Sequence, residues 1–267
     1  MPDGVATAAT APIVLDAIGK RFDTSSGPVQ AVDSVSLTVR REEFVSLLGP
    51  SGCGKSTVLG MIGGLVTPDT GRVLLDGVPC AGPSPEKVAL VFQDGGLFPW
   101  RTALDNVAFG LELRGMPAAK RREIARGLLE PMGLAGFERK YPRELSGGMR
   151  QRVAIARALA LDTPILLMDE PFGALDEQTR LLMGEWLLGI WARTRKTVVF
   201  VTHSLQEAIL LSQRIVVMTA RPGRIKASFE VTLPTPRDLD AAPAATLRRA
   251  LWDAIRDESR RALDGGA

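Results

Sequence analysis

Cysteine is scarce in this chain of 267 residues, and histidine is scarcer still. The two cysteines, Cys53 and Cys80, lie far apart and form no CxxC or Cys/His pattern. The sequence therefore indicates neither a zinc site nor a disulfide framework, and a reducing cytosol suits it. His203 is the single histidine, so no second residue competes for a histidine role.

Long apolar runs are also missing. The most hydrophobic stretches, such as residues 165–168 and 198–201, are far shorter than the roughly 20 residues that cross a bilayer. Any role at a membrane must therefore be peripheral. Residues 1–12 lack the basic and apolar regions of a secretory signal, and we expect a flexible leader there.

Neither sign of charge dominates, since 33 Lys and Arg oppose 30 Asp and Glu, a net charge of +3. This small and evenly spread surplus gives no reason to expect a nucleic-acid partner. With 45% hydrophobic and 24% charged residues, the composition is that of an ordinary globular protein.

Short β-branched runs predict buried parallel strands, and helical patterns fall between them. The expected strands are residues 44–48, 88–92, 165–168, 198–201 and 215–218. The expected helices are residues 56–63, 148–161, 177–193 and 205–212. This alternation is typical of an α/β fold in which helices cover a parallel sheet.

Two further regions depart from this alternation. Residues 13–18, 34–39 and 72–75 alternate apolar and polar side chains and predict a small antiparallel β-layer. Between residues 97 and 145 the strand signal disappears and helical spacing predicts an inserted helical lobe. No internal repeat is present, so we expect a single copy of this α/β unit.

The composition changes after Arg221 to proline, alanine and aspartate. A last helix is expected over residues 245–262, with Leu247, Leu251 and Ile255 on one side. This helix is either an ordinary solvated helix over a modest apolar stripe or a helix that pairs with its copy in a second subunit.

Residues 49–57 read GPSGCGKST, which matches GxxxxGK[ST] and lies between the strand FVSLL and a helix. The glycines let the backbone turn its N–H groups inward, where they and the positive end of the helix hold phosphate oxygens. Lys55 can then reach the β- and γ-phosphates of ATP, and the Ser56 hydroxyl can ligate Mg²⁺. The residues of this predicted phosphate loop are Gly49, Pro50, Ser51, Gly52, Cys53, Gly54, Lys55, Ser56 and Thr57.

Cys53 lies inside this loop, next to a cation and the start of a helix. These conditions can lower the pKa of a thiol. The alternative is that Cys53 is a small residue that fills space.

Residues 165–171 read ILLMDEP, a hydrophobic strand that ends in two acids. Such a strand delivers its last residues to the carboxyl edge of the sheet, where ligands bind in this sheet type. We expect Asp169 to orient Mg²⁺ through its water shell and Glu170 to polarise the attacking water. Taken alone, two acids can simply cap a strand end, but the phosphate loop favours the catalytic interpretation.

Residues 145–151 read LSGGMRQ and precede a strong helical pattern. This segment resembles the signature motif of ABC ATPases, which lies shortly before the Asp-Glu strand in that family. A helix that starts with Ser146 and two glycines offers a second surface for an anion, although serine is also an ordinary N-cap. The resemblance implies that the nucleotide of a partner subunit is contacted by Ser146, Gly147, Gly148 and Gln151.

Four more residues resemble the family in the expected order. Gln93 follows the strand VALVF, as the Q-loop glutamine does, and would sense Mg²⁺ and the γ-phosphate. Asp176 ends GALD, which corresponds to the D-loop, and His203 ends the strand VVFVT like the switch histidine. Phe22 takes the place of the aromatic ring that stacks on adenine, or it is plain core.

The resemblance covers roughly residues 13–224 and implies the fold of a P-loop NTPase of the ABC ATPase type. Such a fold has a RecA-like parallel sheet core, a small antiparallel β-layer and an inserted helical subdomain. The implied domain spans residues 13–233, with the helical insert at about 97–160. Residues 234–267 would form a C-terminal linker and helix.

Within the family, the segments LFPWRTALDNVAFGLELRG, MDEPFGALD and TARPGRI are similar to ATP-binding subunits of nitrate, sulfonate and taurine-type importers. Residues 94–96, Asp-Gly-Gly, depart from the bulkier residues that are usual after the glutamine. In such subunits this loop meets the membrane partner.

The family fold implies that two copies meet head to tail around two ATP molecules. It also implies integral membrane permease subunits as partners, a solute-binding protein as an indirect partner, and a peripheral location on the cytoplasmic face of the membrane. The alternatives are an ABC importer of another solute, a soluble ABC-type nucleic-acid or ribosome factor, and a small-molecule kinase on a P-loop scaffold. The kinase would leave LSGGMRQ and His203 without a task.

Overall fold

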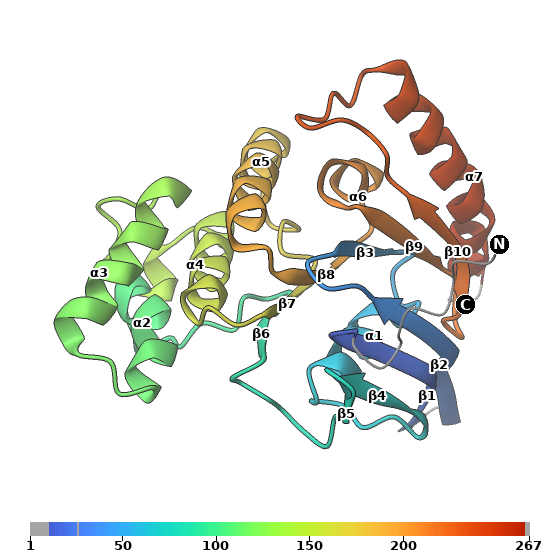
Figure 1. Ribbon diagram of the computed structural model, residues 1–267, viewed down its shortest axis with the longest axis horizontal. Coiled ribbons are helices and arrows are strands. Elements are labelled where there is room, and N and C mark those ends of the chain that lie inside the picture. The colour runs from blue at the N-terminus through green and yellow to red at the C-terminus, as the bar shows by residue number, and fades with distance from the viewer. Residues whose placement is uncertain (1–10, 26, 265–267) are drawn as a thin grey trace. The chain divides into compact units, whose positions relative to one another are not determined.

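The computed structural model describes residues 11–25 and 27–264, and the chain divides into two compact units (Figure 1). The first unit holds the residues before Pro85 and those from Ile190 onward, and the second unit holds Pro85–Gly189. The expected leader at residues 1–10 lies outside the described residues. Among the residues described, no helix combines the length and the apolar character that crossing a membrane requires.

An antiparallel sheet in the first unit confirms the expected β-layer. Its strands, in the spatial order β2-β1-β4-β5, are β1 (Ile13–Thr24), β2 (Gly27–Val39), β4 (Thr70–Leu75) and β5 (Val78–Pro79). Strands β1 and β2 are about twice as long as expected, since the pairing continues beyond shifts in register after Leu15. Ala17 and Ser34 adopt positive φ angles of 47° and 50° there. These irregularities break the two-residue alternation from which strands are predicted.

The second sheet region of the first unit contains the parallel strands that precede the predicted site. Its strands, in the order β10-β9-β3-β8, are β3 (Phe44–Leu48), β8 (Thr197–Thr202), β9 (Arg214–Met218) and β10 (Ile225–Glu230). Strand β3 pairs in parallel with β8 and with β9, and all five of its residues are buried. Strand β10 was not predicted. It pairs antiparallel with β9, and its residues alternate between half-buried and exposed, so it lacks the apolar run of a buried strand.

The second unit is mostly helical, as expected between residues 97 and 145. Its strands β6 (Val88–Val91) and β7 (Ile165–Asp169) pair in parallel. Its helices are α2 (Ala103–Leu113), α3 (Ala118–Leu129), the 3₁₀ turns η2 (Glu130–Met132) and η3 (Pro142–Glu144), α4 (Gly147–Ala160), and α5 (Glu177–Thr194), which runs past the boundary at Ile190.

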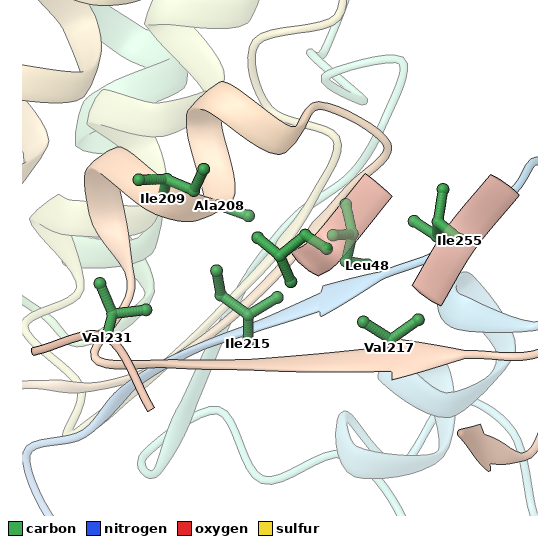
Figure 2. Packing of buried hydrophobic residues seen from close by; sticks show 8 residues of the cluster. Leu48, Ala208, Ile209, Ile215, Val217, Val231 and Ile255 are labelled. Atoms are coloured by element: carbon green, nitrogen blue, oxygen red, sulfur yellow. The ribbon is translucent and has the colours of Figure 1, made fainter. Parts of the chain in front are cut away.

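The first unit also contains α1 (Lys55–Ile62), α6 (Leu205–Leu211) and α7 (Ala242–Asp264). Figure 2 shows the cluster in which α6 and α7 pack on β3 and β9. Its buried members are Leu48, Ala208, Ile209, Ile215, Val217, Val231, Leu251 and Ile255. The apolar stripe of α7 is therefore buried within its own chain, which favours the ordinary solvated helix over the subunit-pairing alternative.

Glu43, just before β3, is buried and joins the end of β2 to β9. Its carboxylate accepts hydrogen bonds from Arg214 Nε and Arg40 Nη2, both at 2.8 Å, and from the Arg40 backbone N–H at 2.7 Å. Burial by itself would raise the pKa of Glu43, but the hydrogen bonds from Arg214 and Arg40 outweigh it and lower this pKa below its ordinary value.

Glu43→Gln is expected to lower the free energy of unfolding by about 3 kcal/mol at neutral pH, because two guanidinium groups lose their buried counter-charge. A lowered folded-state pKa means that the carboxylate stabilises the fold above the ordinary glutamate pKa and loses this effect as the pH falls through the folded-state value. The difference between parent and variant should therefore shrink on acidification. Urea denaturation from neutral to acidic pH measures it, with exposed Glu42→Gln as the control. A difference that does not change with pH would contradict this account.

Candidate functional site

The predicted phosphate loop leaves the buried strand β3 and turns sharply into α1. Gly52 and Gly54 have φ angles of 75° and 96°, a left-handed region that glycine adopts without a steric penalty. Gly54 is the N-cap of α1, and a Cβ atom added to it would lie 2.7 Å from the carbonyl oxygen of Ala31. Gly54 is therefore required both by backbone angle and by space, and Gly52 by backbone angle.

Lys55 holds the two ends of this loop together. Its buried ammonium donates hydrogen bonds to the carbonyl oxygens of Gly49, at 2.9 Å, and Pro50, at 2.8 Å. Cys53 is buried beneath it, and burial raises the pKa of its thiol although the Lys55 charge acts in the opposite direction. Of the two alternatives for Cys53, the structure therefore favours a small residue that fills space over a thiol with a lowered pKa. Ser56 follows in the first turn of α1 and is exposed.

The parallel pairing of β3 and β8 brings His203 to the same edge of the sheet as the phosphate loop. Leu48 lies opposite Thr202, so Gly49 and His203 are the next residues on the two strands. The turn that carries His203 is held by Thr202, whose hydroxyl donates to Glu207 Oε2 at 2.5 Å and accepts from the Ser204 backbone N–H at 2.9 Å. This network fixes the backbone on both sides of the exposed histidine.

Phe22 lies on β1, and 39% of its surface is exposed. Lys20 Nζ lies 5.7 Å from the centroid of its ring. A ring with this exposure is unlike the buried core, and part of its surface is accessible to a ligand.

In the second unit, β6 and β7 pair in parallel, as β3 and β8 do in the first unit. Val91 lies opposite Met168, so Gln93 and Glu170 each follow two residues later at the same edge. Asp169 and Glu170 are half-buried, whereas Gln93 is exposed. Glu170 has a positive φ of 43°, which is uncommon for a residue with a side chain, and its carbonyl accepts from the Gly173 N–H at 3.1 Å.

Ser146 is the N-cap of α4, and its hydroxyl accepts a hydrogen bond from the Met149 backbone N–H at 3.2 Å. Ser146 is exposed, and Gly147 and Gly148 are half-buried. A Cβ atom on Gly148 would lie 2.9 Å from Leu175 Cδ2, so this glycine lets the helix approach the GALD segment. The N-cap alternative is thus confirmed as a local role, and the helix start stays open for a ligand.

Asp176, at the end of GALD, caps α5. Its carboxylate accepts hydrogen bonds from the Thr179 backbone N–H at 2.9 Å and from the Thr179 hydroxyl at 2.7 Å. Both hydrogen bonds lower the pKa of Asp176, and the one from the backbone N–H has the larger effect. The carboxylate therefore fixes the geometry of the GALD turn.

Helix α4 also holds the loop that carries Gln93, a connection that sequence reasoning missed. Gln151 is only 3% exposed, and its Nε2 donates to the carbonyl of Phe92 at 3.4 Å. Arg157 donates to the carbonyls of Gly95 and Gly96 at 2.8 and 2.7 Å. These glycines have φ angles of 75° and 52°, which explains the absence of bulkier residues there. The nucleotide contact of Gln151 stays a prediction.

Comparison with known proteins adds to this geometry. The model of the family described as "ABC transporter" matches residues 32–173. An uncharacterized ABC transporter ATP-binding protein of Methanocaldococcus jannaschii is 50% identical over 244 residues, which cover 91% of each chain. The taurine import ATP-binding protein TauB of Chromobacterium violaceum is 50% identical, with 80% of this chain and 81% of that protein covered. The aliphatic sulfonates import ATP-binding protein SsuB of Bacillus cereus is 42% identical, with 89% and 93% covered.

Among solved structures, the chain is similar to a dimeric post-hydrolysis state of the ATP-binding cassette MJ0796 bound to ADP and Pi. The TM-score is 0.76 at 35% identity, and the match covers 82% of this chain and 98% of that one. The expected fold, with a parallel sheet, an antiparallel sheet and a helical subdomain, is confirmed.

Gly54→Ala is expected to weaken ATP binding by at least about tenfold, because a left-handed backbone costs an L-residue about 1–2 kcal/mol and the new methyl group would meet the Ala31 carbonyl. Titration with a fluorescent ATP analogue measures the loss. Gly82→Ala is the matched control, since a Cβ there has no atom within 4 Å. Parent-like affinity of the Gly54 variant would contradict the assigned loop geometry.

Proposed function

The chain belongs to the ABC transporter family as an ATP-hydrolysing subunit, and we propose that it powers the import of a small anionic solute such as nitrate, a sulfonate or taurine. The observation that supports import is its 50% and 42% identity to ATP-binding proteins named for taurine and aliphatic sulfonate import. The fold and the order of the predicted site residues agree with an ATPase subunit.

The phosphate loop is proposed to hold the β- and γ-phosphates of ATP with its backbone N–H groups and with Lys55. The Ser56 hydroxyl and the Asp169 carboxylate are oxygen donors, which Mg²⁺ prefers, and Gln93 provides a third oxygen. When bound, Mg²⁺ would neutralise charge on the phosphate oxygens. Lys55 must exchange the carbonyls of Gly49 and Pro50 for phosphate oxygens.

Glu170 is proposed to polarise the water that attacks the γ-phosphate, and His203 to contact that phosphate from the adjacent strand end. Phe22 would stack on the adenine ring with its exposed face.

A second copy of the chain is proposed to complete each ATP site. Ser146, Gly147 and Gly148 would contact the nucleotide held by the other copy, with Gln151 and Asp176 supporting the same face. The solved structure described as dimeric and bound to ADP and Pi supports this arrangement. Hydrolysis and release of the γ-phosphate would separate the two copies.

An apolar groove of the second unit is proposed as the docking site for an integral membrane permease. The groove has a volume of about 680 Å³, and its lining includes Phe92, Phe98, Phe109, Leu113 and Arg157. The rings of Phe98 and Phe109 lie 4.5 Å apart, and the Arg157 guanidinium lies 5.6 Å from Phe98. A short helix with an apolar face and an acidic residue fits this lining.

The loop next to the groove is held rigidly. Asn106 is fully buried, accepts from the Phe98 N–H at 2.8 Å, and donates to the carbonyls of Phe98, Arg101 and Thr102. Trp100, on this loop, is 72% exposed. A fixed loop with an exposed tryptophan suits a partner surface.

With a permease as its anchor, the subunit would lie peripherally on the cytoplasmic face of the membrane. An extracytoplasmic solute-binding protein would be an indirect partner, and no nucleic acid would be bound.

Transport assays test this proposal: cells that carry Lys55→Ala should lose uptake of labelled taurine, sulfonate or nitrate. Unchanged uptake of all three solutes would contradict the proposed solute class. Co-sedimentation of the parent protein with ribosomes or DNA would favour the alternative, a soluble ABC-type factor.

Glu170→Gln is expected to trap the ATP-bound dimer, because binding is retained while hydrolysis slows by about a hundredfold or more. Gel filtration with saturating Mg-ATP measures the dimer, and Glu185→Gln, an exposed residue of α5, is the control. A monomeric elution profile of the Glu170 variant would count heavily against the shared site.

Leu113→Asp is expected to abolish co-purification with the permease while ATP binding is unchanged, because a charge enters the apolar groove. Leu182→Asp is the control, since Leu182 is similarly exposed on α5 but does not line the groove. Retention of the permease by the Leu113 variant would rule out this docking site.

A further inference from the structure

The end of α7 is tied to the turn between β9 and β10 by a buried carboxylate. Glu258 is only 2% exposed and accepts hydrogen bonds from the Ala220 backbone N–H at 2.9 Å and from Lys226 Nζ at 2.7 Å. Arg261 adds a third donor at 3.3 Å. Burial opposes the charge, but the bond from Lys226 and the other donors lower the pKa of Glu258, so it is ionised at neutral pH.

The same turn contacts the phosphate loop on its other side. Arg221 Nε donates to the carbonyl of Gly52 at 3.3 Å. Gly223 packs so closely that a Cβ on it would lie 2.1 Å from the Cys53 carbonyl, and its N–H donates to the Ala31 carbonyl at 2.9 Å. The turn is therefore in contact with both the middle of the loop and the strand beneath it.

The turn itself is internally braced. The Thr219 hydroxyl donates to the Pro222 carbonyl and accepts from the Arg224 N–H, both at 2.9 Å. Arg224 also pairs with Asp33 on β2, with Nε to Oδ2 at 3.0 Å. A braced turn transmits a displacement from one side to the other instead of absorbing it.

This turn connects α7 to the loop, since Glu258 binds Ala220 on one side and Arg221 binds Gly52 on the other. A cavity of about 590 Å³, lined by Ser51 and Gly52 on one side and by Glu258 and Arg261 on the other, separates the helix from the loop. The helix is already anchored by Leu251 and Ile255 in the apolar cluster. Glu258 lies one helical turn beyond Ile255, where it makes polar contacts with the turn, with β10 and with Arg261 of α7 itself.

We propose that Glu258 and Arg221 are positioning residues that set the conformation of the phosphate loop, so that the C-terminal helix tunes the affinity for ATP. This inference rests on the proposed phosphate-binding role of residues 49–57. Glu258 fixes Ala220, which precedes Arg221, and Arg221 in turn holds the Gly52 carbonyl. A loop without this contact samples other conformations and binds phosphate less tightly.

The test measures ATP affinity, and separately KM and kcat, on the full-length chain. Arg221→Ala and Glu258→Ala should each raise the Kd and the KM for ATP by roughly three- to tenfold, with kcat changed by less than about twofold. The Kd of the double variant for ATP should be no higher than the higher of the two single-variant values, because both residues act on one contact. Arg221→Lys, which keeps a donor, should recover part of the affinity.

Asp257→Ala is the matched control, since Asp257 is an exposed neighbour on α7. Arg221 is exposed, so its replacement should leave the Tm unchanged even if Glu258→Ala fails to fold. Labelling of Cys53 by a thiol reagent, in a Cys80→Ser background, reports on the loop directly because Cys53 is buried there. The rate at which Cys53 is labelled should rise several-fold in Arg221→Ala, while the Tm stays unchanged.

A parent-like Kd of Arg221→Ala overturns the proposal, and so does a raised Kd with a parent-like labelling rate of Cys53. Neither result affects the assignment of the phosphate loop, which Lys55→Ala tests separately. If Lys55→Ala binds ATP as the parent does, the proposed function itself fails.

Discussion

In the first unit, the parallel ladder between β3 and β8 sets Leu48 opposite Thr202, and the phosphate loop and His203 begin at the next residues. In the second unit, the ladder between β6 and β7 sets Val91 opposite Met168, two residues before Gln93 and Glu170. A shift of one residue in either ladder would turn every side chain to the opposite face. Within each unit, the backbone pairing therefore determines which residues lie together at the carboxyl edge of the strands.

Two buried carboxylates secure the elements around the phosphate loop. Glu43 receives hydrogen bonds from two arginines and connects β2 with β9. Glu258 receives them from the turn after β9 and from Lys226. An ion in a buried site is costly unless it is hydrogen-bonded, and both carboxylates accept hydrogen bonds from charged donors. Glu43 holds the start of β9 through Arg214, and Glu258 holds the turn after β9 through Ala220.

Helix α4 connects the predicted surfaces of the second unit. Its start carries Ser146 and packs through Gly148 on Leu175. Further along, Gln151 holds the Phe92 carbonyl, and Arg157 lines the proposed permease groove while it holds the loop after Gln93. A partner that occupied the proposed groove would therefore contact the same helix that Ser146 caps.

The sequence by itself determined the local features: the strand FVSLL with its glycine loop, the acids at 169 and 170, and the helix caps, because burial and positive φ angles restrict the residues allowed at each position. Only the tertiary structure decided the extent of β1 and β2, the edge strand β10, the Gln151 and Arg157 contacts, and the link from Glu258 to Arg221. Those contacts join residues such as Gly52 and Arg221, 169 positions apart. No local pattern records such a pairing, because it depends on how distant segments pack.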